Sequence, residues 1–244
     1  MADIHARIQG APRQFLVIGE GRNHVAVAQS LEGQWQPQAG PADGVFAPAF
    51  EPRRVQEAWV TNTQVNFCAR AYATVPAAHP DAAVLHVLGR FLGNGFLHRT
   101  IREQGGAYGC GAAYDGDSGS FHFYSYRDPR LAETLADFDA ALRWLEAGPH
   151  EPRRLEEAIL GVIAALDRPS SPAGEASKAF LSQLYGRTPE YRRRLRQRVL
   201  GVGIDDLVRV ARTYLTAEGA HTAVVTGSRQ QETCRALGLE RLSL

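Results

Sequence analysis

The sequence predicts an α+β domain in two layers, in which an antiparallel-rich sheet is covered by helices. Three observations indicate this class. Residues 59–72 and 107–127 alternate apolar and polar side chains, as strands do. Residues 129–215 carry apolar side chains at helical spacing. Residues 223–226 form a short apolar segment after these helices, and we expect it to close the sheet.

The chain of 244 residues is long enough for one large domain or two small ones, and we expect one. Residues 1–12 are assigned to the end of a preceding helix and a linker, and residues 13–244 to a single α+β domain. Residues 15–18 predict a strand. Residues 24–31 fit a helix or a strand, because the apolar period does not decide. Glycines and prolines in residues 33–54 predict a loop or an extended connection.

Residues 59–72 are predicted to form one long strand with an apolar, buried face and a polar face; the apolar row is Val65, Phe67, Ala69 and Ala71. A helix should start at residues 79–81 and continue to residue 104. Gly93 and Gly95 interrupt this helix, and each costs about 1 kcal/mol relative to alanine. That cost indicates a place where another group approaches closely.

The remaining elements follow from turns and periodicity. Residues 107–114 and 120–127 predict a hairpin around the turn at residues 115–119. Pro129 should begin a helix that stops at Gly148, and Pro152 should open the next one. Two or three further helices are expected between residues 173 and 215. A final helix should follow Gly227.

The corner between the predicted helix and the hairpin is the most informative part of the chain. Gly105 and Gly106 permit positive φ and a close approach by another chain. Arg102 carries a planar fork of donors and Tyr108 a single directional donor. Such a pair suits a carbonyl oxygen that becomes an oxyanion. From these residues alone, an ordinary helix end with Arg102 as a surface charge remains an alternative.

Composition and motifs exclude several other function classes. The net charge of +1 argues against a nucleic-acid or membrane partner, and the arginines at 192–198 read as a solvated helix face. No apolar run is long enough for a transmembrane helix. No signal sequence is evident, so we expect a cytoplasmic, bacterial location. The three cysteines form no C-x-x-C pair, and no H-x-x-E-H or H-E-x-x-H motif occurs.

Residues 101–109, Ile-Arg-Glu-Gln-Gly-Gly-Ala-Tyr-Gly, resemble the arginine–tyrosine motif in the C-terminal half of pitrilysin-family (inverzincin) zinc metallopeptidases. Within that family they resemble the presequence-protease and falcilysin subgroup, subfamily C. Four later segments also resemble this subgroup, namely residues 126–135, 160–172, 205–207 and 211–215. The similarity spans residues 60–226, which is most of the chain.

The resemblance implies the metallopeptidase-half fold shared with LuxS and the mitochondrial processing peptidase. It also implies a zinc endopeptidase that degrades unstructured peptides and closes two halves around its substrate. The N-terminal half would hold zinc through H-x-x-E-H, so none is expected in this chain, which we interpret as a C-terminal fragment that is inactive alone. Arg102 would bind a substrate carbonyl and Tyr108 the oxyanion. Gly105, Gly106 and Asn94 would also bind substrate.

Two other functions are considered beside this one. The first is a non-catalytic scaffold or partner subunit of the same fold, like the core subunits of mitochondrial respiratory complexes. Retention of Arg102 and Tyr108 favours the peptidase domain, because a scaffold needs neither. The second is a hydrolase with Cys110 as nucleophile, which strand alternation places on the same face as Tyr108. It would need a neighbouring base that the sequence does not name.

Overall fold

The computed structural model describes residues 4–5, 8, 11, 14–34 and 53–243. The described residues fall into two compact units. Residues 53–168 and 190–243 form the larger unit, which contains the sheet. The smaller unit combines residues 169–189 with the described residues before position 35. The boundary expected near residue 12 stays a prediction.

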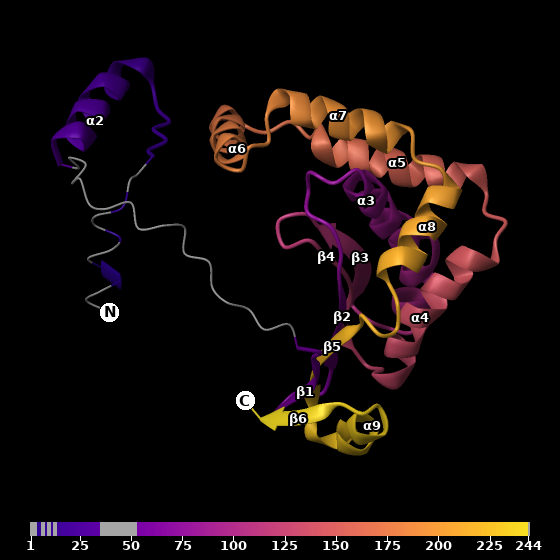
Figure 1. Cartoon of the computed structure of the whole chain (residues 1–244). Coiled ribbons are helices and arrows are strands. Elements are labelled where there is room, and N and C mark those ends of the chain that lie inside the picture. The colour runs from indigo at the N-terminus through magenta and orange to yellow at the C-terminus, as the bar shows by residue number, and fades with distance from the viewer. Residues whose placement is uncertain (1–3, 6–7, 9–10, 12–13, 35–52, 244) are drawn as a thin grey trace. The chain divides into compact units, whose positions relative to one another are not determined.

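The larger unit is built on one six-stranded sheet with the order β3-β4-β2-β5-β1-β6 (Figure 1). Its strands are β1 (Gln56–Thr61), β2 (Asn66–Ala73), β3 (Gly109–Asp115), β4 (Ser120–Asp128), β5 (His221–Gly227) and β6 (Glu240–Ser243). β3, β4, β2 and β5 pair antiparallel, whereas β1 is parallel to both β5 and β6. The predicted α+β class is confirmed, with a mixed rather than a purely antiparallel sheet.

Helices form the second layer. They are α3 (Asp81–Leu92), the π-helical segment η1 (Gly93–Gln104), α4 (Ala132–Ala147), α5 (Pro152–Leu166), α7 (Pro189–Leu200), α8 (Ile204–Tyr214), the short η2 (Ser228–Gln230) and α9 (Gln231–Ala236). α3 packs on β3 and α4 on β2, while α5 and α8 pack on α3 (Figure 1). Phe91, Phe121, Phe123 and Phe138 are fully buried, and the rings of Phe123 and Phe138 stack at 5.4 Å. The core therefore lies between the sheet and α3 and α4.

The long strand predicted for residues 59–72 is wrong. The chain reverses after Thr61, where the Thr63 hydroxyl donates to the Val65 carbonyl at 3.1 Å, and two strands result. β1 and β2 then lie on opposite sides of β5. The alternation of apolar and polar residues continues through the turn, so the sequence pattern does not show this break.

The faces of β2 are also the reverse of the prediction. Phe67 is 40 % exposed, whereas Asn66 and Cys68 are buried. Asn66 is satisfied there because its amide donates to the Asp128 carbonyl at 3.1 Å and accepts from the Thr226 hydroxyl at 2.5 Å. Arg70, on the same face, pairs with Asp139 of α4. Hydrogen bonding and ion pairing thus allow polar residues on the face that meets the helices.

The helix after residue 79 continues through both glycines to Gln104, as predicted. Gly93 and Gly95 lie in η1, whose geometry is π-helical. A Cβ on Gly95 would lie 2.5 Å from the indole of Trp144 in α4, which confirms the predicted close approach at that glycine. Apart from the backbone of its own helix, no atom of the described residues lies within 4 Å of the corresponding position on Gly93. A side chain of another helix therefore comes close to Gly95 but not to Gly93.

Smaller differences occur elsewhere. The helix predicted from Pro129 begins at Ala132; the Asp128 carboxylate accepts the Arg130 amide at 2.9 Å, and the chain bends at residues 129 and 131 before the helix. Residues 15–18 form no strand, and residues 24–31 belong to a helix, α2 (Gly21–Gln34). Most of the predicted loop at 33–54 lies outside the described residues. β6 follows the predicted last helix and was not expected.

The smaller unit contains α2 and α6 (Pro172–Leu184). The Ser171 hydroxyl caps α6 by accepting the Gly174 amide at 3.2 Å, as a helix N-cap does. With α7 and α8, α6 completes the helices expected between residues 173 and 215. In the part of the chain that the structure describes, no helix combines the length and the apolar character that crossing a membrane requires.

Candidate functional site

The corner between η1 and β3 is the turn that the glycine pair predicts. Gly106 has φ +82°, a left-handed value that favours glycine. Its amide donates to the Arg102 carbonyl, and the Ala107 amide donates to the Ile101 carbonyl, both at 3.1 Å. These bonds close the end of η1, and β3 begins three residues after Gly106. Arg102 and Tyr108 therefore lie on either side of one tight turn.

Gly105 has a different reason to be glycine. Its φ is −85°, which any residue adopts, but the guanidinium of Arg130 lies against its α-carbon and would overlap a Cβ there. Arg130 donates to the Asp137 carboxylate at 2.9 Å and to the Thr100 carbonyl at 3.4 Å. The arginine thus ties the end of η1 to α4. The sequence gives no sign of this role for Arg130, because Gly105 and Thr100 precede it by 25 and 30 positions.

Arg102 is exposed, and its side chain is held by one neighbour. Its Nη1 lies 3.3 Å from Nε2 of His98, and Nδ1 of the same histidine lies 3.2 Å from a Glu103 carboxylate oxygen. A neutral imidazole with its proton on Nδ1 satisfies both contacts, because it donates to Glu103 and accepts from Arg102. His98 and Arg102 are four residues apart, a spacing that makes side chains neighbours on a helix, so the sequence does contain a signal for this contact.

Tyr108 lies in the bend before β3, and its side chain is 63 % exposed. Its ring centroid lies 5.6 Å from that of Tyr126, and the guanidinium carbon of Arg127 lies 5.5 Å from the same ring. The Tyr108 amide donates to the Arg127 carbonyl at 3.3 Å. Among the described residues the Tyr108 hydroxyl has no hydrogen-bond partner, so its proton is available to a bound group.

Cys110 does not share a face with Tyr108, contrary to the prediction. Cys110 pairs with buried Ser125 on the face toward the helices, and its thiol contacts the Leu97 carbonyl at 3.3 Å. Tyr108 precedes the first residue of β3, so strand alternation does not extend to it. Burial raises the pKa of the Cys110 thiol to about 11. A nucleophilic cysteine needs a lowered pKa, so the geometry does not support a cysteine hydrolase.

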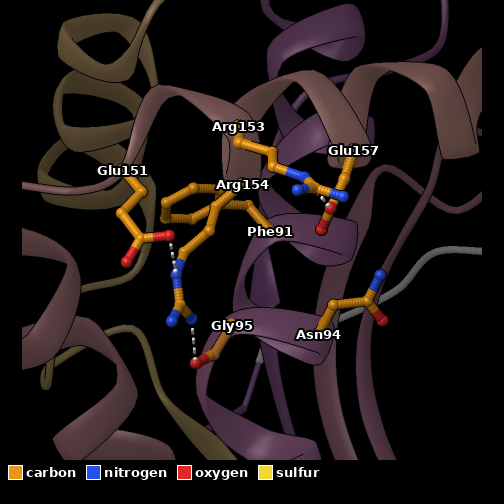
Figure 2. Close-up of a pocket in the computed structure, with 7 residues that line it drawn as sticks. All are labelled: Phe91, Asn94, Gly95, Glu151, Arg153, Arg154 and Glu157. Carbon is orange, nitrogen blue, oxygen red and sulfur yellow. Dashed lines mark hydrogen bonds and ion pairs between the residues drawn. The ribbon is translucent and has the colours of Figure 1, made fainter.

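Asn94 is not part of the corner. It lies in η1 and lines a cavity of about 360 Å³ together with Gly95 of η1, Phe91 of α3 and residues at the start of α5 (Figure 2). Arg154 donates to the Gly95 carbonyl at 3.3 Å and faces Glu151, while Arg153 pairs with Glu157. No lining residue comes from positions 102–108. The role of Asn94 in substrate binding stays a prediction, and so do those of Gly105 and Gly106.

Within residues 4–5, 8, 11, 14–34 and 53–243, no three histidine, cysteine, aspartate or glutamate side chains gather closely enough to hold an ion. The described residues therefore do not fit a zinc ion, which needs about four nitrogen, sulfur or oxygen ligands. The chemistry that the corner offers is hydrogen bonding by a guanidinium and a phenol.

Comparison with known proteins adds to this geometry. A family model described as "PreP C-terminal domain" matches residues 56–227. The mitochondrial presequence protease of Xenopus laevis is 38 % identical over 170 residues, which cover 70 % of this chain and 16 % of that protein. The protein of the same name from Danio rerio is 38 % identical over 221 residues, covering 88 % and 21 %. The chain thus spans about a fifth or less of the curated relatives it matches.

Solved structures agree in fold. A protease from Helicobacter pylori superposes with a TM-score of 0.63 at 19 % identity, covering 82 % of this chain and 52 % of that one. Pitrilysin superposes with a TM-score of 0.64 at 14 % identity, covering 92 % and 25 %. At these identities the likeness concerns the fold alone.

Proposed function

The chain belongs to the PreP C-terminal domain family of pitrilysin-type peptidases, and from this premise we propose that it positions substrate in a zinc-dependent endopeptidase that degrades unstructured peptides. The observation that carries the proposal is the corner at residues 102–108. It presents an exposed guanidinium and an exposed phenol on either side of one turn. Both are hydrogen-bond donors, as a peptide carbonyl requires.

The two side chains take different parts in this proposal. Arg102 binds a backbone carbonyl of the peptide, and its planar fork is kept in place by His98. The Tyr108 hydroxyl donates a hydrogen bond to the oxygen of the scissile carbonyl as negative charge develops there. A donor already in place at the oxyanion accelerates the reaction more than one that must reorganise. Both roles are hydrogen bonds made by side chains of this chain.

The partners follow from the same premise. We expect the N-terminal half of the same peptidase to hold the zinc ion, and the peptide substrate to bind between that half and this domain. The named relatives are mitochondrial proteins, so they do not support the expected bacterial cytoplasm. That location stays a prediction.

The test uses the complete peptidase with Arg102→Ala and Tyr108→Phe. Loss of the phenol hydroxyl should lower kcat about 10²- to 10³-fold, which is the usual cost of one oxyanion donor. Zinc content and the circular dichroism spectrum should not change. Tyr185→Phe is a matched control, since Tyr185 is 64 % exposed and also lies under an arginine, at 5.4 Å from Arg187.

Normal turnover in both variants would refute the proposal. The corner would then be a helix end and nothing more, and the non-catalytic scaffold would be the better interpretation of the fold. A loss of turnover in Tyr185→Phe equal to that in Tyr108→Phe would point to general destabilisation. Measuring the unfolding midpoint of each variant separates that case from a direct effect.

A further inference from the structure

We propose that Tyr126 and Arg127 are positioning residues, which hold the Tyr108 phenol in the orientation that its role requires. The missing side chain of Gly109 is what allows Tyr126 to do so. The inference deepens the proposed function and rests on it. Tyr108 is 63 % exposed at a strand end, so its direction depends on the few groups that touch it.

The backbone of Tyr108 is held from the opposing strand. Its amide donates to the Arg127 carbonyl at 3.3 Å, and the next residue, Gly109, pairs with Tyr126 as the first rung of the β3–β4 ladder. The position of Tyr108 therefore depends on β4 directly. A change in β4 at residues 126–127 moves the residue to which Tyr108 is bonded.

β4 carries an irregularity at this place. Asn66 of β2 pairs with Asp128 and Cys68 pairs with Ser125, so the two residues 126 and 127 face the single residue 67. This extra residue is a β-bulge. Bulges bend a strand and redirect its side chains, and they are common next to functional sites. Here the bulge consists of the two residues whose side chains contact the Tyr108 ring.

Arg127 has φ +48°, a left-handed value that is uncommon for any residue but glycine. Such a conformation persists only where the surroundings hold it. The following residue, Asp128, is fully buried and accepts the Thr134 hydroxyl at 2.8 Å and the Arg130 amide at 2.9 Å. Its carbonyl also accepts the Asn66 amide at 3.1 Å. These bonds keep Arg127 in place, with its guanidinium 5.5 Å from the Tyr108 ring.

The Tyr126 ring lies across the backbone of β3. A Cβ on Gly109 would be 2.5 Å from the Tyr126 hydroxyl oxygen and closer still to two ring carbons. Only glycine leaves room for the ring there. From this position the ring meets Tyr108 at 5.6 Å between centroids, with planes inclined by 59°. An aromatic contact of this geometry is attractive and directional.

The same arrangement recurs two residues further along and serves as an internal control. A Cβ on Gly111 would lie 2.8 Å from the Tyr124 hydroxyl oxygen, so this ring also covers a glycine of β3. Tyr124 contacts His122 at 6.1 Å, and its ring is not among those that meet Tyr108. Alanine at position 109 or 111 therefore adds the same methyl group on the same strand under a tyrosine, but only position 109 affects a ring that touches Tyr108.

The kinetic experiment uses the complete peptidase and an unstructured peptide substrate. We expect Gly109→Ala and Tyr126→Ala to lower kcat about 10- to 100-fold with KM nearly unchanged, because misplacement of a catalytic group acts on the chemical step. Gly111→Ala and Tyr126→Phe should keep normal kcat. In a Tyr108→Phe background, Tyr126→Ala should cause no further loss, since no hydroxyl is left to position.

A second measurement reports on the ring itself and not on catalysis. With 3-fluorotyrosine at position 108, the ¹⁹F resonance should shift in Tyr126→Ala and Gly109→Ala and stay in place in Gly111→Ala. Tyr126→Ala adds no bulk, so it supplies the test even where Gly109→Ala does not fold.

Three outcomes overturn the inference: an unchanged ¹⁹F resonance in Tyr126→Ala, equal kinetic effects of Gly109→Ala and Gly111→Ala, or a full additional loss of kcat in the Tyr108→Phe background. A shifted ¹⁹F resonance with normal kcat has another meaning. With slow turnover in Tyr108→Phe, it refutes the positioning role of Tyr126; with normal turnover in Tyr108→Phe, it refutes the proposed role of Tyr108 itself. The two proposals can therefore fail separately.

Discussion

Gly105→Ala is a sharp test of how the corner is built. The backbone at Gly105 has φ −85° and ψ −19°, which alanine adopts freely, and helix propensity alone favours alanine by about 1 kcal/mol. The added methyl group would, however, lie 2.5 Å from the Ile101 carbonyl oxygen and overlap the Arg130 guanidinium. The expected penalty is therefore steric and not conformational.

Its magnitude follows from what must move. Two groups stand in the way of the methyl group. The Arg130 guanidinium has to leave and lose its bonds to Asp137 and the Thr100 carbonyl, and the Ile101 carbonyl, which is held within η1, has to shift. The Asp137 side chain is only 18 % exposed, and burial raises its pKa, so an unpaired carboxylate there is unfavourable. Overpacking typically costs about 1–3 kcal/mol and loss of a partly buried partner about 1–3. We expect a net destabilisation of about 2–4 kcal/mol.

Urea unfolding of the chain measures this difference, and Gly93→Ala is the matched control. Gly93 opens the same helical segment with φ −56°, and its added methyl group would have no described atom within 4 Å except the backbone of its own helix. Gly93→Ala should therefore stabilise the chain by about 0.5–1 kcal/mol, the opposite sign. Equal stability of the two variants would refute the packing of Arg130 on Gly105. In an Arg130→Ala background, the part of the penalty at Gly105 that comes from displacing Arg130 should disappear, whereas the part that comes from the Ile101 carbonyl should remain.

Two further predictions concern charge. Hydrogen bonds from Arg209 hold the pKa of Asp81 below its usual range, so the pair stabilises the fold above the ordinary carboxyl pKa and loses this effect as pH falls through the lowered value. Arg209→Met should cost about 0.5–1.5 kcal/mol near neutral pH, because Arg209 is 49 % exposed, and much less in acid; a cost that does not change with pH would contradict this. Burial raises the pKa of Cys110 to about 11, that of Cys68 to about 12 and that of Cys234 as well. Cys110 of the native chain should thus react with a thiol reagent at pH 8 on the order of 100-fold more slowly than free cysteine, and rapid labelling of Cys110 would return the cysteine hydrolase to consideration.

The family was predictable from the sequence because its signal is local. Residues 101–109 hold both donors and both glycines within nine consecutive positions, and the family model confirms the resemblance. The turn geometry at Gly106 and the hairpin at residues 115–119 were predictable for the same reason, since residues close in sequence must interact there. The local sequence is therefore enough to predict that Arg102 and Tyr108 lie at one corner.

Contacts between distant residues were not predictable in this way. Arg130 lies 25 positions after the glycine it covers, and Asn66 is buried only because Asp128 and Thr226 arrive from two other strands. The faces of β2 were misassigned because alternation shows two faces without showing which one meets the helices.

By itself, the sequence determined the α+β class, the family and the corner that carries the candidate donors. Only the tertiary structure decided the strand order, the buried face of β2 and the contacts of Tyr126 and Arg127 with Tyr108. The physical reason is that register depends on pairing partners far apart in the chain. A single-residue bulge in β4 changes which side chains meet, and no local pattern records it.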